Sequence, residues 1–342
     1  WARSISILLS LLPAVKMWYS QHAMHMDALA HQALNYETLL HALGGSEAKA
    51  IEAFNHPGIQ HCCHEPLSLH IDAYASHLHL DAELLSKAYW FCRPFFEEMD
   101  DKTVILGWDS PAWPKMVDSF AYRPRFLYAQ GKVQLLSEPS VSVIGTRSPS
   151  LEGKKLALQT SQALSKAGFI VTSGLALGID GVAHKAALAT GSPTIAVIGT
   201  PLSTAYPPEH ADLQAEIART GVVVTRFAPS TTTQKWHFLL RNRLMSALSV
   251  ASIVVEDRDG GGAVRQASFA LEQKKYLFLY QSSVDNHAFL WPRQFANQSR
   301  VFTIKKPEDL PRVLTQAMKD RLSLGKKVQK PVQLDLFSAP SP

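Results

Sequence analysis

Residues Val141–Leu188 have the sequence VSVIGTRSPSLEGKKLALQTSQALSKAGFIVTSGLALGIDGVAHKAAL. This pattern predicts a strand, a glycine turn and a helix, followed by the same three elements a second time. The first apolar run ends at Gly145 and the second ends at Gly174. In a parallel sheet both turns lie at the carboxyl ends of neighbouring strands and lead into helix N-termini. Because backbone N–H groups at such turns bind anions, the stretch predicts a concave site for phosphate.

Strands and helices continue to alternate after this stretch. The candidate strands are short and apolar, which is typical of a parallel sheet covered by helices on both faces. They are Val141–Ile144, Phe169–Thr172, Thr194–Ile198, Val222–Thr225, Ile253–Glu256 and Tyr276–Tyr280. The sequence therefore predicts an α/β fold with a Rossmann-like, doubly wound, mostly parallel sheet.

The chain outside this sheet divides into further segments. We expect a small all-helical module, of the SAM or helix-hairpin-helix-like kind, over residues 1–100, where apolar residues recur at helical spacing. An ordered strap is expected over 101–135, because Gly107–Gly131 holds three prolines and no continuous helix tolerates them. The Rossmann-like domain then covers 136–315, and a basic, flexible tail covers 316–342.

The composition is that of an ordinary globular protein, with 342 residues, 46% hydrophobic residues and a net charge of +5, which allows an anionic partner without requiring one. No run reaches the roughly 18 apolar residues that a membrane span needs, so we expect no membrane association. The cysteines Cys62, Cys63 and Cys92 are odd in number, which favours a cytoplasmic protein over a disulfide scaffold. Adjacent cysteines lack the spacing of a zinc site, so we expect no metal.

The common nucleotide-binding fingerprints are absent from the sequence. It has no G-x-x-x-x-G-K-[ST] motif, and the turn at Gly145 lacks the G-x-G-x-x-G spacing. We therefore expect no nucleotide cofactor, no catalytic residues and no enzymatic activity.

Basic residues follow the glycine turns. Arg147 supplies a fixed charge at the first turn, and Lys185, one turn into the second helix, is placed to pair with phosphate. Asp180 and His184 are four residues apart, so they could instead bond each other at the start of that helix.

A second basic motif, Arg241-Asn242-Arg243, places two guanidinium groups around an amide. We expect these residues to form one short turn that makes bidentate phosphate contacts. A solvated arginine pair is the alternative. Gly260-Gly261-Gly262 adds a third glycine loop at the same edge of the sheet.

From about Trp108 to Lys275, these motifs resemble those of the DprA/Smf family of bacterial DNA-processing proteins. The resemblance is carried by Trp108–Tyr128 with Gly131, Gly145-Thr146-Arg147 with Ser150 and Gly153, Ser173-Gly174-Leu175-Ala176 with Gly178-Ile179-Asp180 and Ala183-His184, Thr194–Gly199, Tyr206-Pro207, and Phe238 with Arg241-Asn242-Arg243. It implies a Rossmann-like fold that binds single-stranded DNA without hydrolysing nucleotides. It also implies a homodimer that helps to load the RecA recombinase during natural transformation.

The resemblance maps a DNA pocket onto this sequence. Its residues are Gly145, Arg147, Ser173, Gly174, Gly178, Lys185, Arg241, Asn242 and Arg243. The sequence departs from the family's pattern at Thr200-Pro201, Thr225-Arg226 and Tyr280-Gln281. These departures affect the far rim of the pocket.

The end of the chain carries a separate motif, Gln333-Leu334-Asp335-Leu336-Phe337. It is similar to the consensus peptide by which bacterial replication and repair proteins bind the β sliding clamp. Its apolar side chains suit a groove, and its proline-bounded position suits an exposed peptide. A tail that docks on its own domain is the alternative.

Two other functions remain open. Related folds include nucleotide phosphoribohydrolases, which use a glycine-rich loop followed by a glutamate, whereas Gly260–Gly262 is followed by Ala263-Val264-Arg265-Gln266. A nucleotide-sensing defence module is the third possibility. We favour a single-stranded DNA-binding protein.

Overall fold

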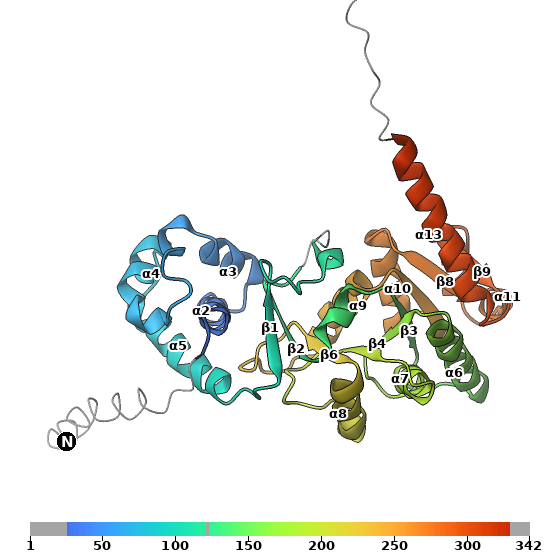
Figure 1. The fold of residues 1–342 in the computed structure, drawn as a ribbon, viewed down its shortest axis with the longest axis horizontal. Helices are drawn as coiled ribbons and strands as arrows, with labels where there is room; N and C mark the ends of the chain where they lie inside the picture. Colours follow the sequence, from blue (N-terminus) through green and yellow to red (C-terminus); the bar gives the residue numbers. More distant parts are fainter. Residues whose placement is uncertain (1–25, 119, 121–122, 329–342) are drawn as a thin grey trace, which may run out of the picture.

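The computed structural model describes residues 26–118, 120 and 123–328 (Figure 1). Its centre is a nine-stranded sheet with the order β1-β2-β6-β5-β4-β3-β7-β8-β9. The strands are β1 (Thr103–Gly107), β2 (Phe126–Gly131), β3 (Ser140–Gly145), β4 (Ile170–Ser173), β5 (Thr194–Val197), β6 (Val222–Thr225), β7 (Ala251–Glu256), β8 (Tyr276–Tyr280) and β9 (Val301–Ile304). All pairs among β3 to β9 are parallel. The predicted mostly parallel, Rossmann-like sheet is therefore confirmed.

The strand order reverses beside β3. From β3 the chain builds outward through β4, β5 and β6, and it then adds β7 on the other side of β3. Val143 of β3 is aligned with Ile253 of β7 in this parallel pair. Ligands of doubly wound sheets bind in the crevice outside the strand ends at such a reversal. The topology therefore places a candidate site after Gly145 and Glu256.

Helices cover both faces of the sheet, as Figure 1 shows. One face packs against α6 (Leu151–Lys166), α7 (Ile179–Ala189), α8 (Ala211–Thr220) and α13 (Asp309–Val328). The other face packs against α9 (His237–Leu248), α10 (Gly262–Glu272) and α12 (Trp291–Ala296), with the short α11 (Gln281–Asp285) after β8. Burial on both faces explains why the central strands are unbroken apolar runs in the sequence.

The segment expected to be a strap contributes two strands to the sheet. β1 and β2 form an antiparallel pair, and β2 also pairs with β6 in the antiparallel sense. Phe126 to Ala129 are all buried, so β2 shows no alternation of apolar and polar residues that would reveal it. Between the two strands, Trp113, Val117 and Phe120 are buried against the face that carries α9.

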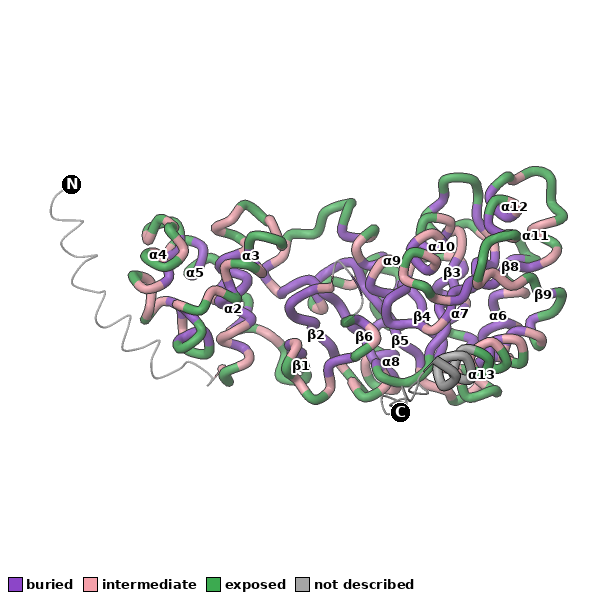
Figure 2. The backbone as a smooth tube through the Cα atoms, turned by 90° about the horizontal axis from the view of Figure 1, so that it is seen from above, coloured by how far each residue is buried: buried purple, intermediate pink, exposed green. Residues whose placement is uncertain are grey.

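The helices before β1 share a core with the edge of the sheet. They are α2 (Ala28–Ala42), α3 (Glu47–Phe54), α4 (Ile71–Leu78) and α5 (Ala82–Glu97). Leu34 and Leu39 are fully buried in this core, together with Phe126 and Tyr128 of β2. Figure 2 shows buried segments in the strands and in α2 and α5. The helical module is thus packed on the sheet through apolar contacts.

The C-terminal part differs from the prediction of a flexible tail from residue 316. Helix α13 continues to Val328, and Leu310 and Leu314 anchor its first half on the sheet. The peptide Gln333–Phe337 lies outside the described residues. Within the described part of the chain, no helix has the length and apolar character that crossing a membrane requires.

Candidate nucleic-acid interface

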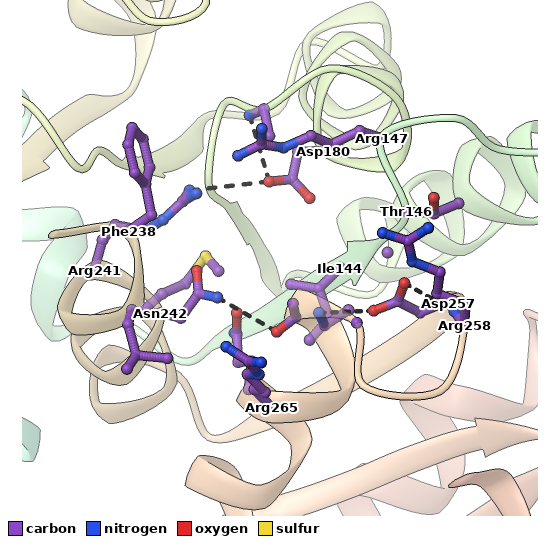
Figure 3. Close-up of a pocket in the computed structure, with 18 of the residues that line it drawn as sticks. Ile144, Thr146, Arg147, Asp180, Phe238, Arg241, Asn242, Asp257, Arg258 and Arg265 are labelled. Atoms are coloured by element: carbon purple, nitrogen blue, oxygen red, sulfur yellow. Dashed lines mark hydrogen bonds and ion pairs between the residues drawn. The ribbon is translucent and has the colours of Figure 1, made fainter. Parts of the chain in front are cut away.

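A cleft of about 510 Å³ lies at the strand reversal between β3 and β7. Its walls are the loops that follow β3, β4 and β7 together with the first turns of α9 and α10 (Figure 3). Gly145, at the end of β3, lines it, and a Cβ there would collide with Ile179 and with the carbonyl of Glu256. This glycine therefore lets the three loops approach one another.

Cationic side chains dominate the charge of the cleft. The five that line it are Arg147, Lys235, Arg241, Arg258 and Arg265. The two carboxylates of the lining are Asp180 and Asp257. The cleft therefore carries an excess of positive charge, which favours an anionic ligand.

Backbone N–H groups already bind both carboxylates. Asp180 Oδ2 accepts hydrogen bonds from the N–H groups of Gly174 at 3.2 Å and Ala176 at 3.4 Å. Asp257 Oδ2 likewise accepts from Ala263 at 2.8 Å and Val264 at 3.2 Å. In the second turn, the N–H groups of Gly174 and Ala176, which we expected to bind phosphate, are therefore occupied by Asp180. Side chains supply the positive charge instead.

Arg241 lies beneath the cleft and holds three elements together. Its Nη1 donates to the carbonyl of Gly174 and, at 3.2 Å, to the carbonyl of Val197, and it lies 3.9 Å from Asp180 Oδ2. Its side chain is only 6% exposed. Burial lowers the pKa of Arg241 and raises the pKa of Asp180, while the attraction between the two charges opposes both shifts. Arg241 therefore joins β4, β5 and the start of α7, and the structure does not offer it as an exposed phosphate contact.

Three other predicted pocket residues shape the loops from behind. Ser173 is fully buried, and its hydroxyl donates to the carbonyl of Val143 at 2.7 Å. A Cβ on Gly174 would collide with the guanidinium of Arg241. Gly178 has φ +79° and packs against the backbone of Arg147, where a side chain would not fit. These residues position the cleft and do not face its ligand.

Lys185 and Arg243 do not line the cleft. Lys185 is exposed on α7 outside it. Arg243 lies over the ring of Phe269 at 4.1 Å and pairs with Glu272 at 3.6 Å. The predicted short turn around Arg241 and Arg243 was wrong because α9 is continuous from His237 to Leu248, and residues two positions apart on a helix do not face the same way.

Asn242 and His184 have defined partners. Asn242 lines the cleft, and its Nδ2 donates to the carbonyl of Gly262 at 3.4 Å, which links α9 to the start of α10. His184 Nδ1 contacts Thr194 Oγ1 at 2.8 Å, so the alternative of an Asp180–His184 bond is not observed. Burial lowers the pKa of His184 to about 3, so this histidine is neutral.

Four cations of the cleft have no carboxylate partner among the described residues: Arg147, Lys235, Arg258 and Arg265. The ring of Phe238 lines the same cleft and lies 6.0 Å from the guanidinium of Arg147 and 5.1 Å from the ring of Tyr206. Figure 3 shows Arg147 and Arg265 on opposite sides of the opening. Within the residues described, no group of three or more His, Cys, Asp or Glu side chains is arranged to hold a metal ion.

Lys235, Arg258 and Arg265 were not identified from the sequence as residues of the cleft. Arg258 comes two residues after β7, and β7 pairs with β3 at the strand reversal. That position was a usable signal, because residues after the strands at a reversal face the crevice. Lys235 immediately precedes α9 among polar residues, and nothing local distinguishes it from a surface lysine.

A family model described as DNA recombination-mediator protein A matches residues 104–310. The chain belongs to this family. The resemblance to the DprA/Smf proteins is thereby confirmed, since relatives carry those names. DNA processing protein DprA of Bacillus subtilis is 34% identical over 55% of this chain and 63% of its own length. Protein Smf of Synechocystis is 34% identical over 56% of this chain and 49% of its own length. The chain thus spans about half to just under two thirds of these recombination-mediator relatives.

Solved structures of the family have the same fold. The X-ray structure of DNA processing protein A from Streptococcus pneumoniae matches with a TM-score of 0.67 and 25% identity, over 81% of this chain and 96% of that chain. A structure of DNA processing protein A from Helicobacter pylori, which concerns the single-stranded DNA binding mode of that protein, matches with a TM-score of 0.55 and 28% identity, over 64% of this chain and 97% of that chain.

Proposed function

We propose that this chain binds single-stranded DNA with the phosphate backbone in the cleft between β3 and β7. The observation that carries the proposal is the set of four cations without carboxylate partners in the described structure, which line the same cleft as the ring of Phe238. Such cations bind phosphates whatever the base sequence, and a partly exposed aromatic ring such as Phe238 can stack on a base. The single-stranded DNA binding of the Helicobacter pylori relative supports this assignment.

The physiological role that follows is that of a recombination mediator in the cytoplasm. A homodimer that holds single-stranded DNA would present it to the RecA recombinase, in natural transformation or in repair. The peptide Gln333–Phe337 would add binding to the β sliding clamp. Family membership supports the mediator role.

We also propose that the chain is not an enzyme. General acid or base catalysis needs a carboxyl or imidazole group free to exchange a proton with the ligand. Asp180 and Asp257 line the cleft but accept hydrogen bonds from backbone N–H groups. This occupation argues against the nucleotide-processing alternative.

The test compares binding and catalysis in the same preparation. By fluorescence anisotropy, the protein is expected to bind labelled oligo-dT more tightly than a DNA duplex of the same length. Incubation with nucleoside monophosphates is expected to release no free base, as followed by chromatography. Base release, or tighter binding of the duplex, would contradict the proposal. Stimulated assembly of RecA on the bound oligonucleotide is the expected result for the mediator role.

A further inference from the structure

A second cavity of about 340 Å³ lies between the helical module and the edge of the sheet. Its lining comes from α2, from single residues of α3 and α5, from β2 and the two residues before it, from the loop 226–232 and from the start of α9. It shares no lining residue with the cleft, yet the two are neighbours. Lys235 and Phe238 line the cleft, whereas Trp236 and His237 line the cavity. The start of α9 therefore forms the ridge between them.

Flat rings form much of the wall. The rings of Phe227 and His237 are stacked at 4.1 Å with an interplanar angle of 20°. On the opposite helices, His41 and Phe91 are stacked at 4.6 Å with an angle of 22°. Trp236 is 55% exposed at the rim. Rings placed in this way favour a planar ligand that stacks between them.

The charges of the cavity favour a neutral ligand. Arg226 pairs with Glu47 at 2.5 Å, and the guanidinium of Arg125 lies 4.8 Å from the ring of Phe126. With Glu37, the lining thus holds two arginines and two glutamates. A charged group of either sign placed inside the cavity would lie beside a like charge, so the part of a ligand that enters it is expected to be neutral, with any phosphate outside.

Glu37 supplies the group that would orient such a ligand. It is 9% exposed, and its Oε1 accepts hydrogen bonds from Ser230 Oγ at 3.3 Å and Thr231 Oγ1 at 3.4 Å. Its Oε2 has no hydrogen-bond partner among the residues that the structure describes. An acceptor that faces the cavity beside aromatic side chains suits a ligand with N–H donors.

We propose that this cavity binds a guanine base, with Glu37 accepting from the base edge and Trp236 stacking on the ring. Among the nucleobases, guanine presents two adjacent N–H donors on its Watson–Crick edge, and a carboxylate accepts both. If the base belongs to a DNA strand, that strand runs from the cleft across the first turn of α9, and in this form the inference rests on the proposed function. A free guanine nucleotide is the other source of the same chemistry.

The experiment measures base preference, which is separate from the affinity of the cleft. We compare oligo-dT with the same oligomer carrying one central dG. The dG oligomer is expected to bind about tenfold more tightly, as bidentate base recognition commonly provides. Glu37→Gln and Trp236→Ala are each expected to reduce this preference below about twofold. Trp90→Ala removes an exposed tryptophan on α5 outside both sites and is expected to retain the full preference.

A second arm titrates guanosine monophosphate by calorimetry and identifies the source of the base. The wild type could bind guanosine monophosphate and yet show no preference for the dG oligomer. If Glu37→Gln then abolishes the binding of guanosine monophosphate, the cavity recognises the base of a free nucleotide. Neither dG preference nor guanosine monophosphate binding in the wild type would overturn the inference. If the wild type still binds oligo-dT in that case, the proposed function is unaffected and only the guanine inference is rejected. Trp236→Ala, at an exposed position, keeps the test valid if Glu37→Gln fails to fold.

Discussion

Arg241 shows how burial changes what an arginine can do. The residue belongs to the basic motif Arg241-Asn242-Arg243, and a guanidinium group can make bidentate hydrogen bonds to phosphate. In the structure its guanidinium is held by the carbonyls of Gly174 and Val197 and by the charge of Asp180. The charge therefore stabilises the loops of the cleft from below. Residues at the surface of the cleft, such as Arg258, remain available to the ligand.

Replacing Arg241 is expected to destabilise the protein. Arg241→Ala leaves Asp180 as a buried charge without its partner, which costs about 3 kcal/mol of the free energy of unfolding. The pKa of Asp180 in the folded variant then rises further above the pKa in the unfolded chain. Burying Asp180 therefore costs little at low pH, where its carboxyl is protonated, and destabilises the fold as pH rises and the carboxyl ionises. Urea denaturation is therefore expected to show a larger deficit at pH 8 than at pH 5.

The exposed Arg258 provides the comparison for this prediction. Arg258→Ala is expected to change the free energy of unfolding by less than about 0.5 kcal/mol, as is usual for surface positions. Equal stability of the Arg241→Ala and Arg258→Ala variants would show that Arg241 is not a structural residue.

Helix α9 distributes its residues over three surroundings. Phe238 and Asn242 line the cleft, while Trp236 and His237 before and at its start line the second cavity. Arg243 lies on another side, against Phe269 and Glu272 of α10. One helix thus borders the cleft, the second cavity and α10, and its orientation decides which of its basic residues face the cleft.

The position of each basic residue on its element predicts its effect on binding. Arg243→Ala and Lys185→Ala are expected to change the affinity for oligo-dT by less than about twofold at moderate salt, because neither side chain lines the cleft and distant surface charges are screened. Arg265→Ala, on the first turn of α10, is expected to weaken binding severalfold through the loss of a phosphate contact. Fluorescence anisotropy measures all three. A loss for Lys185→Ala as large as for Arg265→Ala would place the strand along α7 instead.

The elements were easier to predict than the site that they form. Runs such as Val222–Thr225 are apolar because both of their faces are covered, so the central strands could be recognised from composition alone. Three predicted residues do line the cleft. Gly145 and Arg147 lie there because they end and follow β3 at the strand reversal, and Asn242 lies there because it is on α9, which faces the reversal. The blocking of the backbone donors by Asp180 depends on side-chain directions, which local sequence does not determine.

At the scale of the whole molecule, the cleft and the second cavity lie on either side of one ridge. The helical module shares its core with β2 and closes the second cavity, while the strand reversal forms the cleft. The module therefore contributes residues to the wall of the second cavity and is packed on the sheet.

The salt dependence of oligo-dT binding tests the central claim most directly. Each phosphate of a single strand that a cation neutralises contributes about 0.7 to the slope of log affinity against log salt. The double variant Arg258→Ala with Arg265→Ala is therefore expected to lower the affinity and to reduce that slope by about 1.4. Arg219→Ala, an exposed arginine on α8 outside the cleft, is the control and is expected to leave both unchanged. A double variant with the affinity and slope of the wild type would contradict the placement of the DNA backbone in this cleft.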